Sequence, residues 1–178
     1  MFYSSKDKCI RPGSVAPDFE LTDNTGNLWR LSDNRGNVVL LLFYPANETL
    51  VCTRQLCSLR DNWDKYRATQ AEIVAISSAP SEENHRFAEK YKLPIRILSD
   101  EGRRITSLFA AHRLFPSSFM RAVTVIDANG IVRTHQSMLR AFRPDDHDIL
   151  LALYAARSEV FDAKRRELRN RIRKILLS

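Results

Sequence analysis

The segment from Pro45 to Cys57 reads PANETLVCTRQLC and holds the residues of this sequence best suited to chemistry. Two thiols, Cys52 and Cys57, are five positions apart, and Thr49 and Pro45 precede the first thiol by three and seven positions. A thiolate is the nucleophilic form of cysteine, a threonine hydroxyl can donate a hydrogen bond towards it, and a proline can shield one side of a loop from water. This spacing suits a site that holds a small polar oxidant against a thiolate.

Each of these residues also has an ordinary explanation. Unpaired cysteines are most often small, buried and unreactive. Thr49 alone would be read as a helix N-cap, and Pro45 alone as a loop residue. The chemical interpretation therefore depends on the elements that position Cys52.

Those elements predict a favourable position for a thiolate. The apolar run Val38–Tyr44 is bounded by turn residues, which is typical of a strand covered on both faces. Apolar residues at spacings of three and four predict a helix over Thr49–Gln70. Cys52 then lies in the first turn of a helix that follows a buried strand, where free backbone N–H groups and the helix dipole favour an anion.

The rest of the chain continues the alternation of strands and helices. We expect a short strand, a turn at Asn24–Asn27 and a second strand at Leu28–Leu31. The later patterns predict a strand at Glu72–Ala79, a helix at Ser81–Leu93 with Ser81 as its N-cap, a strand at Arg96–Leu98, a short helix at Asp100–Ala111, a hairpin at Arg121–Ser137 that turns at Asp127–Gly130, and a helix at Pro144–Ala156. This order predicts an α/β fold in which helices flank a central mixed β-sheet.

Length and composition limit the class of protein. A chain of 178 residues, 44% apolar and 28% charged, is expected to be a globular protein with one main domain. Its N-terminus lacks the pattern of a secretory signal, and its three cysteines do not suggest a secreted disulfide framework, so we expect a cytoplasmic location. The four histidines are scattered and no Cys/His group has zinc-like spacing, so neither a metal nor a cofactor is expected.

The excess positive charge gathers at the C-terminal end. Residues 157–178 hold eight Lys or Arg and three acidic residues. We expect residues 1–156 to form the domain and residues 157–178 a basic amphipathic helical extension with a stripe of Phe161, Leu168, Ile172 and Ile175. This extension could dock on its own domain or pair with a second subunit in a homodimer. Contact with nucleic acid or a membrane is the less favoured alternative, because net basicity is weak evidence for it.

Several separated motifs, in the right order, resemble those of the peroxiredoxins, which are thiol peroxidases with a thioredoxin-like fold. They are G-x2-A-P-D-F-x-L from Gly13 to Leu21, F-Y-P-x3-T-x2-C-T from Phe43 to Thr53, C-x-L-R-D from Cys57 to Asp61, L-S-D from Leu98 to Asp100, and R-x4-I-D from Arg121 to Asp127. The likeness covers about Gly13 to Tyr154 and is strongest to the subgroup known as PrxQ or bacterioferritin comigratory protein.

The resemblance implies a role for each residue that matches a family motif. Cys52 corresponds to the peroxidatic cysteine, whose thiolate attacks a peroxide oxygen and becomes a sulfenic acid. Thr49 and Pro45 correspond to the hydroxyl donor and the shielding proline. Arg121 corresponds to the arginine that favours the thiolate and holds the peroxide oxygens; without the resemblance it would pass as an exposed charge on a strand. Gln55 occupies a position where many relatives have Glu and some have Gln.

Cys57 corresponds to the resolving cysteine of the subgroup. In one regular helix, Cα atoms five residues apart are separated by roughly 8.7 Å, whereas a disulfide tolerates at most about 7 Å. We therefore expect the first turns of Thr49–Arg60 to unwind after oxidation, so that Cys57 swings over and an intramolecular disulfide forms. By family analogy, an outside dithiol such as thioredoxin would then reduce it. Cys9 is read as an incidental thiol or as a supplementary resolving thiol.

One residue departs from the family pattern, and three functional classes stay open. Leu50 stands where the family usually has Pro directly after the threonine, which bears on rate and substrate preference. The leading class is a thiol peroxidase that reduces hydrogen peroxide, organic hydroperoxides or both. The second is a redox-sensing or binding protein with slow turnover, which Leu50 favours. The third is a protein thiol–disulfide oxidoreductase, although the usual C-x2-C of that class is absent.

Overall fold

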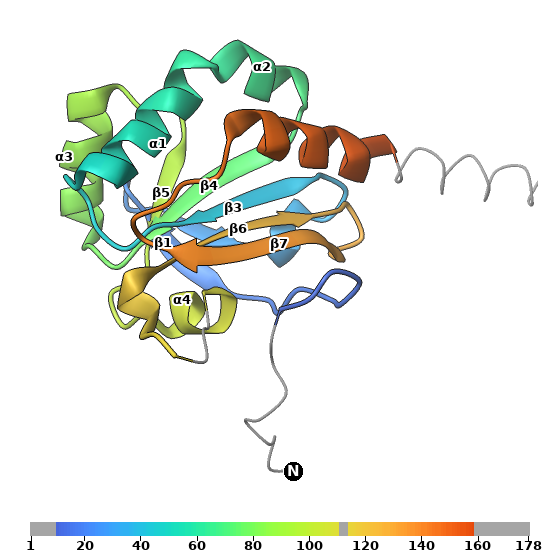
Figure 1. The fold of residues 1–178 in the computed structure, drawn as a ribbon, viewed down its shortest axis with the longest axis horizontal. Helices are drawn as coiled ribbons and strands as arrows, with labels where there is room; N and C mark the ends of the chain where they lie inside the picture. Colours follow the sequence, from blue (N-terminus) through green and yellow to red (C-terminus); the bar gives the residue numbers. More distant parts are fainter. Residues whose placement is uncertain (1–9, 111–113, 159–178) are drawn as a thin grey trace, which may run out of the picture.

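The computed structural model describes residues 10–110 and 114–158, and its centre is a seven-stranded mixed sheet with the strand order β2-β1-β5-β4-β3-β6-β7 (Figure 1). The strands are β1 (Glu20–Asp23), β2 (Leu28–Arg30), β3 (Val39–Phe43), β4 (Glu72–Ser77), β5 (Arg96–Ser99), β6 (Met120–Ile126) and β7 (Val132–Leu139). β3, β4 and β5 run parallel, and the other neighbouring pairs are antiparallel. The predicted α/β class and mixed sheet are confirmed.

Helices cover both faces of this sheet. They are α1 (Leu50–Asp61), α2 (Trp63–Ala68), α3 (Ser81–Tyr91), α4 (Arg104–Phe109) and a helix over residues 146–158, with 3-10 turns at Ser32–Asn34 and Ser117–Phe119. Figure 1 shows α1, α2, α3 and the 146–158 helix on one face and α4 on the other. Among the described residues, no helix is both long and apolar enough to cross a membrane.

The alternation of side chains along β3 explains how one apolar strand serves two cores. Leu40 and Leu42 pack with α1, α2, α3 and the 146–158 helix, whereas Leu41 and Phe43 pack on the face that carries α4. Successive strand residues point to opposite faces, so a strand buried on both sides reads as a continuous apolar run. The end of β3 therefore lies under α1, which is where the reactive segment begins.

The predicted helix over Thr49–Gln70 is two helices. α1 ends at Asp61, because Asn62 leaves helical geometry at φ −102° and ψ 17° and its side-chain amide donates to the Ser58 carbonyl at 3.0 Å. Asparagine side chains compete for backbone groups in this way, which interrupts helices. α2 then begins at Trp63.

Two other details of the prediction are wrong. The N-cap of α3 is Pro80 and not Ser81, because the Ser81 hydroxyl donates to the Asp23 carbonyl at 2.5 Å instead of capping its own helix. α4 is shorter than predicted and begins at Arg104. The carboxylate of Asp100 accepts hydrogen bonds from the amides of α4 at Ile105 and Thr106, so this residue lies outside the helix and stabilises its beginning.

Gly130 provides the positive φ that the predicted hairpin turn requires. Its φ is +80°, and a Cβ atom there would overlap the guanidinium of Arg35. The predicted domain boundary at residue 156 stays a prediction: the helix that contains it continues to residue 158, and the apolar stripe of the extension and Cys9 lie outside the described residues.

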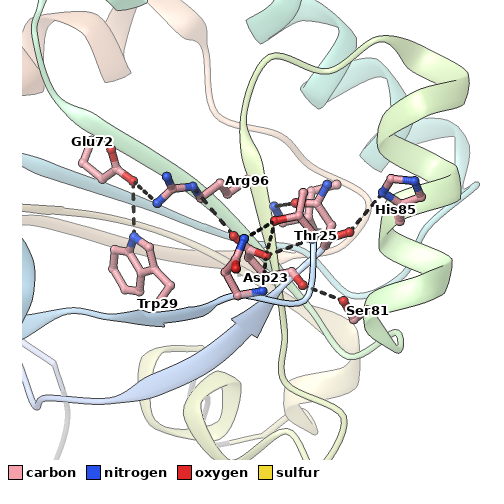
Figure 2. A network of polar contacts seen from close by, with 10 residues as sticks. Asp23, Thr25, Trp29, Glu72, Ser81, His85 and Arg96 are labelled. Carbon is pink, nitrogen blue, oxygen red and sulfur yellow. Dashed lines mark hydrogen bonds and ion pairs between the residues drawn. The ribbon is translucent and has the colours of Figure 1, made fainter.

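A polar cluster joins the β1–β2 hairpin to α3 and, through Arg96, to the neighbouring strands β5 and β4 (Figure 2). Asp23 accepts hydrogen bonds from the amide and hydroxyl of Thr25, and α3 contacts the same turn through Ser81 and through His85, whose ring lies 3.1 Å from the Asn24 carbonyl. Burial alone would raise the pKa of Asp23, but these hydrogen bonds, with the charge of Arg96, hold it below its usual value. The cluster contains no thiol, and it holds the β1–β2 hairpin against α3.

Candidate functional site

Cys52 lies at the N-terminal end of α1, as the sequence predicts. Thr49 is the N-cap residue, with extended φ and ψ of −82° and 143°, so Cys52 is the third residue of the helix. Its side chain is 1% exposed and belongs to the apolar cluster between α1 and the sheet. Backbone N–H groups in a first helical turn have no partner within the helix and attract negative charge. Cys52 therefore lies at a helix end whose N–H groups can bind a negative charge.

Arg121 is fully buried and meets Cys52 from the neighbouring strand. Its Nη2 atom lies 3.0 Å from the Cys52 sulfur, within hydrogen-bond distance. β6 pairs with β3 in antiparallel register with Ala122 opposite Phe43, which brings Arg121 to the end of β3 where α1 begins. Arg121 also shares its sheet face with Val123, which packs in the α1 cluster. Without the family resemblance, the sequence suggests that Arg121 is an exposed charge on a strand. The burial of Arg121 shows that this interpretation is wrong.

Gln55 is the third member of this buried group. It follows Cys52 by three positions, so it lies on the same face of α1, and its Oε1 atom accepts a hydrogen bond from Nη1 of Arg121. A longer contact of 3.4 Å joins Arg121 to the carbonyl of Arg140. Within the described residues, Gln55 Nε2 and Arg121 Nε have no hydrogen-bond partner. Among these residues, the group thus keeps two buried nitrogen donors that are not used.

Pro45 and Thr49 lie where the chain passes from β3 to α1, but they are placed differently. Pro45 is buried, which agrees with a shielding role, whereas Thr49 is exposed. The Thr49 hydroxyl is 3.5 Å from the Ala46 carbonyl, and no hydrogen bond joins it to Cys52. Both residues line a pocket of about 490 Å³, together with Leu50, Phe119, Arg103 and Arg140. The pocket gives an approach to the beginning of α1.

Cys57 lies in the same helix as Cys52 and is partly buried, and both thiols are free. The sequence prediction that one helix contains the two thiols is confirmed. Because five residues of regular helix separate Cα atoms by roughly 8.7 Å, more than the roughly 7 Å that a disulfide allows, the two thiols cannot be bridged in this conformation. A disulfide between Cys52 and Cys57 therefore requires α1 to rearrange.

A buried hydrogen-bond network that the sequence analysis missed holds the loop before α1. The Tyr44 hydroxyl donates to Asn47 Oδ1 at 2.7 Å, and Asn47 Nδ2 donates to Asn84 Oδ1 at 2.9 Å. Ser77, at the end of β4, donates to the same oxygen of Asn84 at 2.7 Å. Burial raises the pKa of Tyr44 far above its usual value, so the phenol stays a donor. No local pattern predicts contacts between residues that are 37 positions apart.

Glu48, at the surface, also holds this loop in place through its side chain. It has a left-handed backbone with φ +58°, which is uncommon for residues other than glycine. Its carboxylate accepts two hydrogen bonds of 2.9 Å from Lys90 and one of 2.9 Å from the Tyr91 hydroxyl, at the end of α3. These contacts hold the backbone conformation that brings Thr49 into its N-cap position.

The chemistry of the site therefore rests on a thiol, a guanidinium and a carboxamide. Among the described residues, no group of three or more His, Cys, Asp or Glu side chains is arranged to hold a metal ion. A buried thiol in contact with a fixed cation suits nucleophilic attack on a small electrophile whose developing negative charge the cation can stabilise.

Comparison with known proteins relates this arrangement to a family. The model of the AhpC/TSA family matches residues 12–135. The chain is 39% identical over 139 residues to the chloroplastic peroxiredoxin Q of Sedum lineare, an alignment that covers 78% of this chain and 74% of that protein. It is 37% identical over 139 residues to the chloroplastic peroxiredoxin Q of Triticum aestivum, covering 78% of this chain and 63% of the wheat protein.

Solved structures agree on the fold. The crystal structure of the peroxidoxin BcpB from Mycobacterium tuberculosis superposes with a TM-score of 0.69 at 31% identity, covering 84% of this chain and 97% of that chain. The reduced 2-Cys peroxiredoxin of Plasmodium vivax gives a TM-score of 0.74 at 24% identity over 83% of this chain and 82% of that chain, which is a likeness of fold alone. The predicted thioredoxin-like fold is confirmed.

Proposed function

Because this chain belongs to the AhpC/TSA family and is a peroxiredoxin, we propose that it reduces peroxides through Cys52, with Arg121 as the group that activates the sulfur. The observation that carries this proposal is the 3.0 Å contact between Arg121 Nη2 and the Cys52 sulfur at the beginning of α1. A guanidinium cannot lose its proton under physiological conditions, so it supplies a permanent positive charge beside the thiolate.

In the first step, the Cys52 thiolate attacks one oxygen of the peroxide. An S–O bond forms and the O–O bond breaks, so the sulfur is oxidised to a sulfenic acid while the peroxide takes up two electrons. The second oxygen leaves as hydroxide or alkoxide and takes up a proton, so hydrogen peroxide yields water and an organic hydroperoxide yields an alcohol. The exposed Thr49 hydroxyl would orient the peroxide at the pocket, and buried Pro45 would keep water from one side of the sulfur.

In the second step, Cys57 resolves the sulfenic acid as an intramolecular disulfide. Its position in α1 supports this role only if part of the helix unwinds, as argued above from the spacing. The cycle closes when an external dithiol of the thioredoxin type reduces the disulfide by thiol–disulfide exchange. The need for an external dithiol suits a reducing compartment, and we propose that the protein is cytoplasmic. The relatives named above are chloroplastic. Imaging of the tagged protein therefore tests the location.

Intact-mass measurement after one equivalent of hydrogen peroxide tests both thiol roles. We expect the wild-type chain to lose two hydrogens, Cys57→Ser to gain one oxygen, and Cys52→Ser to do neither. Cys9→Ser is the matched control and should behave as the wild type. If Cys52 reacts no faster than free cysteine, the slow redox sensor is the better description. If the protein reduces insulin disulfides instead, the oxidoreductase alternative gains support.

We also propose that the basic extension over residues 157–178 pairs two subunits. Its supporting observation is the sequence pattern of apolar residues on a basic helix. The described part of the chain favours a cut after Ser158, because Arg157 donates hydrogen bonds to the carbonyls of Ala68 and Thr69 and belongs with the domain. Gel filtration of the full chain and of residues 1–158 should give a dimer and a monomer; identical states would contradict the proposal.

A further inference from the structure

Asp146, the first residue of the 146–158 helix, joins that helix to both α1 and α2. Its Oδ2 atom accepts a hydrogen bond from the Ser58 hydroxyl, and its Oδ1 atom accepts one from the Tyr66 hydroxyl at 2.6 Å. Tyr66 is fully buried, and Ser58 directly follows Cys57 in α1. One carboxylate therefore holds α1 immediately after the second thiol, and Figure 1 shows the 146–158 helix running beside α1 and α2.

A second contact holds the end of α1. The Arg60 guanidinium donates to the Tyr91 carbonyl at 2.7 Å, at the end of α3, and Leu59 between the two tethered residues is 1% exposed. From Ser58 onward, α1 is thus attached to two other elements by hydrogen bonds that involve a charged group. Such hydrogen bonds are stronger than those between neutral partners.

The first part of α1, residues 50–57, is held differently. Among the described residues, its side-chain hydrogen bonds to other elements are the two that Cys52 and Gln55 accept from Arg121. One of these involves the sulfur that peroxide would oxidise, so oxidation changes a contact that holds this part in place. Cys52 and Leu56 also pack in the apolar cluster, but apolar contacts are not directional and can re-form in a new arrangement.

We propose that Asp146 is a positioning residue for disulfide formation: it keeps Ser58, and with it Cys57, in place while residues 50–56 unwind. Cys52 is then the thiol that travels, rather than Cys57 as the spacing alone suggests. This inference rests on the proposed function, because Cys52 must first be oxidised. The Cys57 sulfur attacks the sulfenic sulfur, the S–S bond forms, the S–O bond breaks, and hydroxide leaves as water with the thiol proton. No further oxidant is needed, since the peroxide has already taken two electrons.

Amide hydrogen exchange on the reduced and the disulfide forms of the full chain tests where unwinding stops. In the wild type, we expect the amides of residues 53–60, which donate to the carbonyls of residues 49–56, to lose protection on oxidation. The amides of Asn62, Lys65 and Tyr66, which donate to Ser58 and Asn62, should keep it. In Asp146→Asn, the amide replaces one acceptor oxygen by a donor, so one of the two hydrogen bonds is lost and protection should fall at Asn62, Lys65 and Tyr66 as well. Asp145→Asn is the matched control: this exposed neighbour caps the His147 amide at 2.8 Å, and asparagine can do the same.

Stopped-flow kinetics supplies a readout that a purely structural role would not move. We expect Asp146→Asn and Ser58→Ala to form the sulfenic acid at the wild-type rate but the disulfide about threefold or more slowly, because Cys57 is no longer held as a fixed target. Ser58→Ala keeps the Asp146–Tyr66 contact and decides the question if Asp146→Asn does not fold.

Two results would overturn the inference: wild-type protein that loses protection as fully at Asn62, Lys65 and Tyr66 as over residues 53–60, or variants with a wild-type boundary and a wild-type disulfide rate. A different result, wild-type protein that neither gains oxygen nor loses two hydrogens in the intact-mass measurement, removes the proposed function and this inference with it.

Discussion

Arg121 and Cys52 are 69 positions apart in the sequence, yet the Nη2 atom of the arginine lies 3.0 Å from the cysteine sulfur in a site closed to solvent. The contact joins the second residue of β6 to the first turn of α1. A buried cation is stabilised when an opposite charge and hydrogen-bond acceptors surround it. The Cys52 sulfur and the carboxamide oxygen of Gln55 both accept hydrogen bonds from this guanidinium. In the proposed reaction, a thiolate at Cys52 would supply the opposite charge.

Replacing Arg121 by glutamine should slow the reaction of Cys52 with hydrogen peroxide by roughly 10- to 150-fold. This range corresponds to the loss of a hydrogen bond to a charged group, about 1.5–3 kcal/mol. Stopped-flow competition with a second peroxide scavenger measures the rate. Arg104→Gln is the matched control, since it removes an exposed arginine on α4. An Arg121→Gln rate close to the wild-type rate would count against the role of the guanidinium.

Replacing Leu50 by proline should stabilise the protein by about 0.4–1 kcal/mol, because proline reduces the freedom of the unfolded chain. Leu50 is the first residue of α1 and is 66% exposed. Proline is favoured at this position because the amide there has no partner within the helix, and the extended backbone of Thr49 suits the residue before a proline. Thermal unfolding should show a rise of a few degrees; a fall would mean that the proline disturbs the first turn. Val51→Ala serves as a control for a change in the side chain alone.

Glu48 should stabilise the fold only while its carboxylate is charged. Hydrogen bonds from Lys90, and then from Tyr91, hold the pKa of Glu48 below its ordinary value of 4.5. A carboxylate with a lowered folded-state pKa contributes stability above its unfolded-state pKa and loses that contribution as the pH falls through the folded-state pKa. We therefore expect Glu48→Gln to have a lower urea midpoint than the wild type at neutral pH. The difference should shrink as the pH falls below 4.5 and through the lower folded-state pKa. A constant difference between the two proteins across this range would contradict the assignment.

His135 should make the fold less stable in mild acid. Burial lowers the pKa of this imidazole below 6.5, and its Nδ1 atom lies 2.9 Å from the hydroxyl of Thr124, which is itself buried. The unfolded chain then binds a proton more readily than the folded chain, so stability is lost as the pH falls below 6.5. Urea unfolding should show this loss in the wild type and a smaller one in His135→Gln. His85→Gln is the control, since His85 is exposed on α3.

The sequence alone predicted the elements that depend on local pattern. The run Val38–Tyr44 contains β3, and the spacing of apolar residues placed Cys52 and Cys57 in one helix with Thr49 before it. These features follow from backbone periodicity and capping, which act over a few residues. The break at Asn62 was missed, because the helical pattern of apolar residues continues across it while a side-chain hydrogen bond ends the helix.

The sequence by itself determined which residues have the chemistry: a thiol at a helix N-terminus after a buried strand, and a second thiol too far along the same helix to reach it. Only the tertiary structure decided what surrounds them. The burial of Arg121 depends on the register between β3 and β6, and the hold on Ser58 depends on a carboxylate 88 positions away. The contact of Arg121 with Cys52 and that of Ser58 with Asp146 each join segments that are distant in the sequence. Folding brings these segments together when the two apolar faces of the sheet are covered, so no local pattern of residues encodes either contact.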